Sequence, residues 1–371
     1  MDYNWLNYSK VKHANVGGRY VTNDDVFPFL ESLPNLFLVT EIGKSVLGKS
    51  IKMISAGSGS NKILMWSQMH GNESTTTKAV LDLLNFLKTD AHEAKEILKN
   101  CTLCIIPILN PDGAAAYTRI NANEIDLNRD AQDRSQPESK VLRAVYDDFQ
   151  PDFCLNLHDQ RTIFNVGATN KPATVSFLAP AFDAERNISE SRKKSMQIIV
   201  AMNTMLQNLI PNQVGRYDDG FNANCVGDAF QMLETPTILF ESGHFPNDYE
   251  REQTRKYIFF SLLTAIQTIQ KDEIANYDLA DYFKIPENGK LFLDIIISNA
   301  NHVNAGHAAN TSLGLLYKEV LKNGKIVFEP YVVETGRLNQ FYAHKTYNCL
   351  DESDLKSLQQ DSRLWKIINQ K

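Results

Sequence analysis

The sequence predicts an α/β fold: a mixed, largely parallel sheet flanked by helices on both faces, followed by a small C-terminal β-rich appendage. Segments typical of strands and of helices alternate from about residue 35 to residue 270. The strand segments are continuous apolar runs, a pattern typical of strands covered by helices on both faces. After about residue 285 the apolar runs follow one another with turn signals between them, which indicates a separate group of strands.

The expected elements of the larger part are short apolar strands and longer helices with apolar residues at helical spacing. The strands are residues 36–43, 50–57, 62–68, 102–109, 152–158 and 235–242. The helices are residues 74–88, 138–149, 190–210 and 248–269. Alternation of this kind predicts a single α/β unit, which we place at residues 1–280.

Residues 285–371 form the expected β-rich appendage. Its apolar runs are residues 291–298, 313–321 and 326–334. The last two are joined by Asn323 and Gly324, a pair that tolerates the positive φ angles of a tight hairpin turn.

Composition excludes several classes of protein. The chain has 371 residues, of which 43% are hydrophobic and 22% charged, as in ordinary globular proteins. Its net charge of −6 argues against nucleic acid as the main partner, and no apolar run is long enough to span a membrane. No secretory leader is visible, and five cysteines in mostly apolar surroundings are expected to be free thiols. We therefore expect a cytoplasmic protein.

The first candidate site is the His-Gly-Asn-Glu segment at residues 70–73. It lies between an expected strand and an expected helix, where open α/β sheets place their sites. His70 and Glu73 offer a nitrogen and an oxygen ligand, and a catalytic zinc takes three protein ligands and a water. A third ligand should therefore lie downstream. The alternative is that His70 only caps a turn.

Two further residues end expected strands and can meet His70 and Glu73 at the same edge of the sheet. His158 closes the run 152–158 and is a candidate for the third ligand. Glu241 ends the run 235–242, where a carboxylate beside a metal site could take a proton from water. Alternatively, His158 is structural and Glu241 caps the helix expected near Asp248.

A polar loop follows the Asn-Pro-Asp-Gly turn at residues 110–113. It contains Arg119, Asn128 and Arg129. Arginine binds carboxylates in a bidentate manner, and an arginine can also stabilise a developing oxyanion. The alternative is a solvated loop with surface charges.

Together these segments resemble the zinc carboxypeptidases of the carboxypeptidase A/B type, over roughly residues 20–270. The resemblance rests on the segments IGKSVLGKSIKMISAG, MHGNE, NPDG, R-x-N-x-x-x-x-D-L-N-R-D, LNLHDQ and TILFESG, which follow the order of the family. One such segment would be weak evidence, whereas six in order are specific.

The resemblance implies that one zinc ion is held by His70, Glu73 and His158. Glu241 matches the general base, which activates the water and later protonates the leaving amine. Arg119 matches the arginine that polarises the scissile carbonyl. The implied protein is a metallopeptidase that hydrolyses peptides.

The resemblance also implies how the substrate is held. Asn128 and Arg129 match the pair that binds the terminal carboxylate, so the implied substrate is a peptide or acyl amino acid with a free carboxylate. The family also has a mobile tyrosine that covers the substrate. Tyr217, 24 residues before Glu241, is a weak candidate for it because no motif fixes the match. Asp228 would favour basic side chains if it points into the specificity pocket, or it is a structural hydrogen bonder.

Two alternatives remain. The FESG segment and the β-rich C-terminal part also resemble the aspartoacylase and succinylglutamate desuccinylase branch, whose members cleave N-acyl amino acids with the same metal ligands. The IGKSVLGKSI segment favours the carboxypeptidase branch. The other alternative is an inactive relative that acts only as a binding module. The intact set of metal ligands, general base and arginines argues against it.

Overall fold

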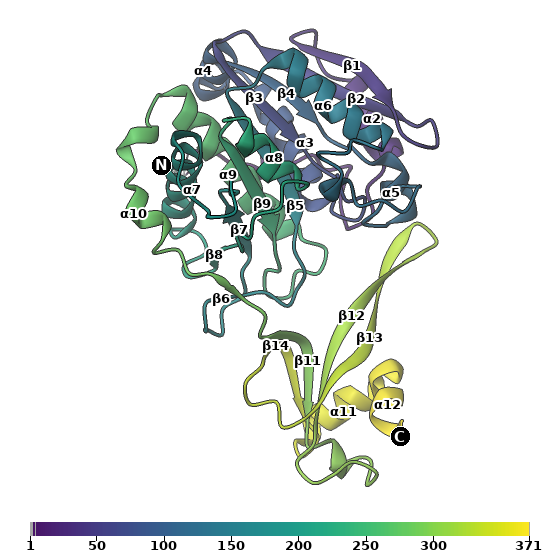
Figure 1. Cartoon of the computed structure of the whole chain (residues 1–371). Helices are drawn as coiled ribbons and strands as arrows, with labels where there is room; N and C mark the ends of the chain where they lie inside the picture. The colour runs from purple at the N-terminus through teal and green to yellow at the C-terminus, as the bar shows by residue number, and fades with distance from the viewer. Residues whose placement is uncertain (1–2, 4, 371) are drawn as a thin grey trace.

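The computed structural model describes residue 3 and residues 5–370 (Figure 1). Its largest element is an eight-stranded sheet with the strand order β1-β2-β4-β3-β5-β9-β7-β8. The strands are β1 (Phe37–Lys44), β2 (Ser50–Gly57), β3 (Asn61–Trp66), β4 (Cys101–Ile106), β5 (Phe153–Asp159), β7 (Val175–Leu178), β8 (Val214–Arg216) and β9 (Thr237–Ser242). A separate two-stranded ladder pairs β6 (Asn165–Val166) with β10 (Asn288–Gly289).

The sheet is mixed, with a parallel centre. β4, β3, β5 and β9 run parallel to one another, whereas β1 and β2 are antiparallel and β7 runs antiparallel to β9. All seven residues of β5 and all six of β9 are buried. Their sequences are mainly apolar for this reason, apart from polar residues such as Asn156, His158 and Glu241. The predicted fold class is confirmed.

Helices cover both faces of the sheet, and the side chains of β3 show how. Ile63 and Met65 belong to the core shared with α3, α4, α7 and α9, whereas Leu64 and Trp66 belong to the core shared with α6 and α8. The helices are α1 (Tyr8–Val11), α2 (Asn23–Glu31), α3 (Thr75–Leu87), α4 (His92–Asn100), α5 (Pro111–Ala116), α6 (Pro137–Phe149), α7 (Glu190–Leu206), α8 (Val226–Met232), α9 (Glu252–Gln270) and α10 (Leu279–Tyr282).

The six expected strands and four expected helices are all present, with boundaries shifted by a few residues. The last helix, α9, begins at Glu252 rather than near Asp248. The Asp248 carboxylate accepts hydrogen bonds from the backbone N–H groups of Glu252 and Gln253, at 3.0 and 2.6 Å. The alternative that Glu241 caps this helix is therefore wrong, because Asp248 has that role and Glu241 lies within β9.

The C-terminal part contains a four-stranded sheet with the order β13-β12-β11-β14. Its strands are β11 (Phe292–Ser298), β12 (Ser312–Lys322), β13 (Lys325–Gly336) and β14 (Tyr342–Asn348). The predicted hairpin turn joins β12 to β13, with φ angles of 50° at Asn323 and 73° at Gly324. Two helices that the sequence analysis did not predict, α11 (Glu352–Gln360) and α12 (Ser362–Asn369), cover the sheet through Leu358, Leu364 and Ile368.

The two sheets are connected by hydrogen bonds as well as by the chain. The hydroxyl of Tyr249 donates to the carboxylate of Asp294 at 2.9 Å, and His344 Nε2 lies 2.8 Å from the carbonyl oxygen of Thr162. The hydroxyl of Tyr117 donates to Glu319 on β12. Figure 1 shows the β12–β13 hairpin extending from the C-terminal sheet back toward the larger sheet.

The described residues include no helix that is both long and apolar enough to cross a membrane. All five cysteines are free, and four of them are buried.

A buried ion pair connects α3 to α9 and gives a test of the packing. Asp82 and Arg255 are both 0% exposed, and Arg255 Nη2 lies 2.6 Å from Asp82 Oδ1. We expect Asp82→Ala to lower the free energy of unfolding by about 3–5 kcal/mol, because a buried guanidinium would lose its only fully buried carboxylate partner. Urea denaturation measures this. Asp147→Ala, which removes a partly exposed pair with Arg143, should cost less than about 1 kcal/mol. Equal losses in the two variants would contradict this account.

Candidate metal centre and active site

The corner that carries His70 is shaped by backbone contacts rather than by a regular element. After β3, Gln68 adopts a φ of 46°, and its side-chain nitrogen donates to the carbonyl oxygens of Val21 and Gly71. Gly71 lies so close to Gly113 of the Asn-Pro-Asp-Gly turn that an added Cβ would be 1.9 Å from its carbonyl carbon. The two segments therefore pack through their glycines, which places His70 beside the polar loop.

Glu73 is held in place by the neighbouring strand. The backbone N–H of Asp159, at the end of β5, donates to Glu73 Oε2 at 3.1 Å. The Asp159 carboxylate in turn accepts hydrogen bonds from the N–H and the hydroxyl of Thr75 at the start of α3. These hydrogen bonds connect the first turn of α3 to the end of β5. They therefore fix the position of Glu73 relative to His158.

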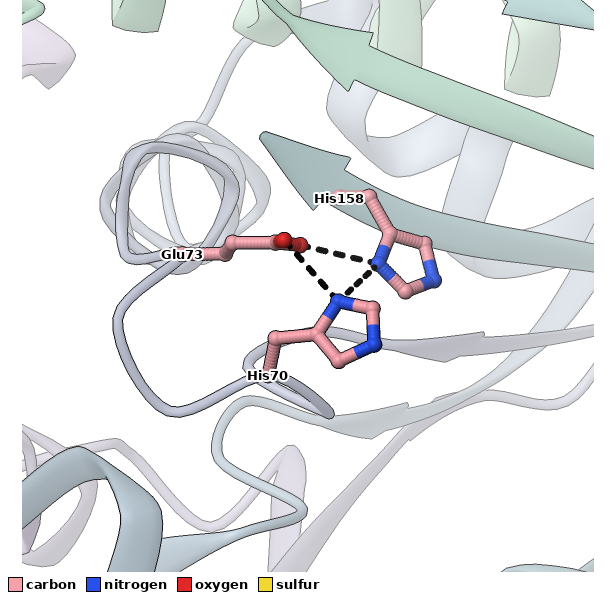
Figure 2. Close-up of side chains that lie close together, drawn as sticks. All are labelled: His70, Glu73 and His158. Atoms are coloured by element: carbon pink, nitrogen blue, oxygen red, sulfur yellow. Dashed lines mark hydrogen bonds and ion pairs between the residues drawn. The ribbon is translucent and has the colours of Figure 1, made fainter. Parts of the chain in front are cut away.

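Three side chains from these segments converge on one point (Figure 2). His70 Nδ1 lies 2.9 Å from Glu73 Oε1, and His158 Nδ1 lies 2.9 Å from Glu73 Oε2. The two Nδ1 atoms are 3.0 Å apart. All three residues are buried, and together they form a group that could hold a metal ion.

The hydrogen bonds around this group fit a cation at its centre. His70 Nε2 lies 3.0 Å from Asp126 Oδ1, so it donates to that carboxylate, and Nδ1 is left unprotonated with a free lone pair. That lone pair faces a carboxylate and a second imidazole nitrogen, an arrangement that a cation stabilises. A set of two imidazoles and one carboxylate is typical of catalytic zinc. The residues present therefore fit the metal that the sequence analysis expected.

The pKa values reflect the same crowding of charge. Burial opposes protonation of both imidazoles. For His158 burial prevails and lowers the pKa, whereas for His70 the nearby Glu73 and Asp126 outweigh it and raise the pKa. Burial also acts to raise the pKa of Glu73, but the two histidines hold it well below its usual range. Glu73 is therefore a carboxylate, the form that binds metals.

Glu241 lies beside the three converging residues on β9. It is paired with His158 across the parallel ladder of β5 and β9, so both project from the same edge of the sheet. It is buried, and its Oε2 has no hydrogen-bond partner among the described residues. Burial raises the pKa of its carboxyl well above the usual range, and the charges of Glu73 and Asp159 add to this effect. A buried carboxyl with a raised pKa can both accept and return a proton.

Arg119 reaches the three converging residues from the polar loop. Its Nε donates to Asp126 Oδ2 at 3.0 Å, and its Nη1 lies 3.4 Å from Glu73 Oε1 and 3.2 Å from His70 Nδ1. The side chain is 47% exposed, so it combines a fixed end with access to solvent. It is placed to donate a hydrogen bond to a group bound at the centre.

Asn128 and Arg129 lie on the same loop, in a short 3-10 helix (Leu127–Arg129). Asp126 caps this helix by accepting from the N–H of Asn128, so one carboxylate positions His70, Arg119 and Asn128. The Asn128 side chain accepts from the N–H of Val226 at 3.2 Å. Arg129 is exposed and donates to the Asn128 carbonyl oxygen at 2.7 Å.

Tyr217 and Asp228 form no described hydrogen bond to His70, Glu73 or His158. The Tyr217 ring packs against Phe164, and none of its described hydrogen bonds is to the converging residues. Burial raises the pKa of its phenol, and the charges of Glu241 and Glu73 contribute, so these groups lie nearby. Asp228 lies in α8 and accepts from the N–H of Asn222 at 2.8 Å. Burial raises its pKa to about 6.

The sequence analysis missed the role of Asp126. This residue lies in the quoted D-L-N-R-D segment, between Arg119 and Asn128, but it was given no function. Its signal was its position in a polar loop that carries the other candidates. Its effect on His70 could not be found from the sequence, since 56 residues separate the two.

Comparison with known proteins supports the resemblance to zinc carboxypeptidases. Residues 28–144 match the family model described as zinc carboxypeptidase. A probable carboxypeptidase 2 of Arthroderma benhamiae is 28% identical over 134 residues, 35% of this chain and 25% of that protein. Carboxypeptidase SOL1 of Arabidopsis thaliana is 29% identical over 169 residues, 39% of this chain and 34% of that protein. The chain thus spans about a fifth to a third of the length of the curated relatives it matches.

The fold is similar to that of known structures over a longer stretch. A metallo-carboxypeptidase from Burkholderia cenocepacia superposes with a TM-score of 0.56 at 17% identity, over 68% of this chain and 70% of that one. These findings favour the carboxypeptidase branch over the N-acyl amino acid branch. Residues 28–144 therefore resemble the zinc carboxypeptidase family, and the larger part of the chain has the fold of the metallo-carboxypeptidases.

Proposed function

We propose that this protein is a zinc-dependent metallocarboxypeptidase that hydrolyses the peptide bond next to a free terminal carboxylate. The observation that carries the proposal is the convergence of His70 Nδ1, His158 Nδ1 and the Glu73 carboxylate, with Asp126 accepting the other ring proton of His70. Residues 1–280 would form the catalytic domain and residues 285–371 a second, β-rich domain. The free thiols favour a cytoplasmic location.

The proposed chemistry is hydrolysis by an activated water. Zinc held by His70, Glu73 and His158 would supply a Lewis acid and lower the pKa of water to about 7. Glu241 accepts a proton from the attacking water and delivers it to the leaving nitrogen as the C–N bond breaks. Arg119 donates to the carbonyl oxygen, on which negative charge develops.

The terminal carboxylate of the substrate would bind on the other side of the scissile bond. Asn128 and Arg129 offer an amide and a guanidinium on the loop that also carries Arg119, and a guanidinium matches the geometry of a carboxylate. Tyr217 would cover the substrate from its position near Glu241. Asp228 would tune the choice of the terminal side chain from α8.

The first test compares peptides that differ only at the C-terminus. Zinc-loaded protein should release the last residue from a panel of peptides with free C-termini and leave the amidated forms intact, because Arg129 has no carboxylate to bind in the amides. Mass spectrometry of the products measures both. Cleavage of free and amidated peptides at equal rates would reject the proposal. Hydrolysis of N-acyl amino acids without any cleavage of the peptides would also reject it.

A second test addresses Glu241. We expect Glu241→Gln to lower kcat by at least about a hundredfold while the bound zinc stays near one per chain, because the amide cannot accept the proton. Turnover and elemental analysis of the same preparation measure this. The control is Glu234→Gln, which changes an exposed carboxylate just before β9. Near-normal turnover in Glu241→Gln would remove this residue from the chemistry.

A third test addresses Asp126. Asp126→Asn should weaken zinc binding about ten- to a hundredfold, since the amide no longer fixes the protonation of His70. Competition with a chelator of known affinity gives the dissociation constant. Asp133→Asn, an exposed change in the following segment, should leave that constant unaltered. Unchanged zinc affinity in Asp126→Asn would mean that the His70–Asp126 hydrogen bond has no such role.

A further inference from the structure

A cleft of about 330 Å³ lies between the converging metal-ligand residues and the C-terminal sheet. Its size is at the lower end of the range of about 300–1,000 Å³ for small-molecule sites. One wall belongs to the larger sheet and includes Asn72 and Glu73. The opposite wall is the β12–β13 hairpin, which contributes Tyr317, Glu319 and Tyr331.

The hairpin wall is fixed by contacts at the cleft itself. Glu319 accepts a hydrogen bond from the hydroxyl of Tyr117, and its Oε1 lies 3.3 Å from Arg19 Nη2. Tyr117 and Arg19 also line the cleft. The C-terminal sheet is thus part of the wall of this space.

The cleft is on the acyl side of the proposed site. Glu73 and Asn72 line it, whereas Asn128, Arg129 and Asp228 do not. A substrate whose terminal carboxylate binds at Asn128 and Arg129 would place its scissile carbonyl at the metal. The residue before that bond would then continue into the cleft. This step rests on the proposed function.

Two buried guanidinium groups line the cleft with unused donors. Arg251 is 1% exposed, and its Nη2 donates to the carbonyl oxygen of Gln160 at 2.8 Å and its Nη1 to that of Ser242. Among the described residues it has no ion pair with a carboxylate, and its Nε has no partner. Arg19 is 6% exposed, and its Nε is also unpartnered. Arg19 already pairs with Glu319, whereas Arg251 has no carboxylate partner in the described part of the chain. An unpaired buried cation is costly, which makes a carboxylate ligand favourable beside Arg251.

The carboxylates that line the cleft are largely engaged elsewhere. Asp294 accepts from the hydroxyl of Tyr249 and from the N–H of Tyr317. Glu319 is bound by Tyr117 and Arg19. Asp159 binds Thr75 through Oδ2, and only its Oδ1 lacks a partner. That oxygen remains available to accept from a peptide N–H.

We propose that this cleft binds the residue preceding the scissile bond and that Arg251 and Arg19 make it selective for an acidic residue, glutamate or aspartate. The substrate carboxylate would pair with guanidinium groups that are themselves buried, and charged hydrogen bonds to buried groups are strong. The substrate N–H would donate to Asp159. The preferred substrates are short peptides with an acidic penultimate residue.

The main test compares glutamate with its neutral isostere. Zinc-loaded protein is assayed on N-acetyl-Glu-X and N-acetyl-Gln-X, where X is the terminal residue that the enzyme releases fastest from a peptide panel. We expect kcat/KM to be at least about tenfold higher for the glutamate peptide, a difference of about 1.4 kcal/mol. Equal values, or a preference for glutamine, overturn the inference alone. Absence of turnover on every peptide in the panel overturns the proposed function and the inference with it.

Variants identify the groups responsible. Arg251→Gln should lower the Glu/Gln ratio of kcat/KM toward one. Because Arg251 also holds two backbone carbonyls, Arg19→Gln provides a second variant, with thermal unfolding recorded for both. The control is Arg192→Gln, which alters a guanidinium that is 1% exposed but pairs with Asp219 away from the cleft and should keep the ratio. A ratio unchanged in folded Arg251→Gln and Arg19→Gln would overturn the assignment.

Discussion

The site depends on the register of the parallel strands at the centre of the sheet. β5 and β9 pair His158 with Glu241, and β3 lies beside β5. The segments that follow these parallel strands therefore all begin at the same edge of the sheet. A shift of one residue between β5 and β9 would turn one of the two side chains to the other face of the sheet. The register is kept by the two helical layers, because β3 and β5 bury alternate residues in different cores. Packing far from His70, Glu73 and His158 therefore determines the distances among these candidate ligands.

The concentration of buried charge has an energetic cost that the fold must offset. Glu73, Glu241, Asp126 and Asp159 lie close together around two buried imidazoles, and burial acts to raise the pKa of the first three of these carboxyls. Such an arrangement destabilises a protein unless hydrogen bonds or a cation compensate. Backbone and hydroxyl donors at Asp159 and Thr75 provide part of the compensation. A cation would provide the rest, which is why the same residues that fit a metal make a poor structural core without one.

The sequence was most informative where local pattern and tertiary structure agree. The central strands are mainly apolar because both faces are covered, and the Asn323-Gly324 turn has the positive φ angles that its residues favour, so both were predictable. The candidate ligands were found because each lies at or just after the end of a strand, and the ends of parallel strands meet. Asp126 was not predicted, since its role depends on a loop reaching back to His70. The start of α9 was misplaced because Asp248 caps the helix from a position that resembles its first turn.

The C-terminal sheet shows the limit of sequence reasoning most clearly. Its strands could be predicted from their apolar runs, but nothing in residues 285–371 indicates which face of the larger sheet they approach. That is decided by individual polar contacts, such as Tyr117 with Glu319 and Tyr249 with Asp294, between residues far apart in the chain. These contacts bring a hairpin to the edge where the candidate metal ligands converge. A segment that composition describes only as a β-rich appendage thereby becomes one wall of a cleft beside these residues, and the buried Arg19 and Arg251 also line that cleft.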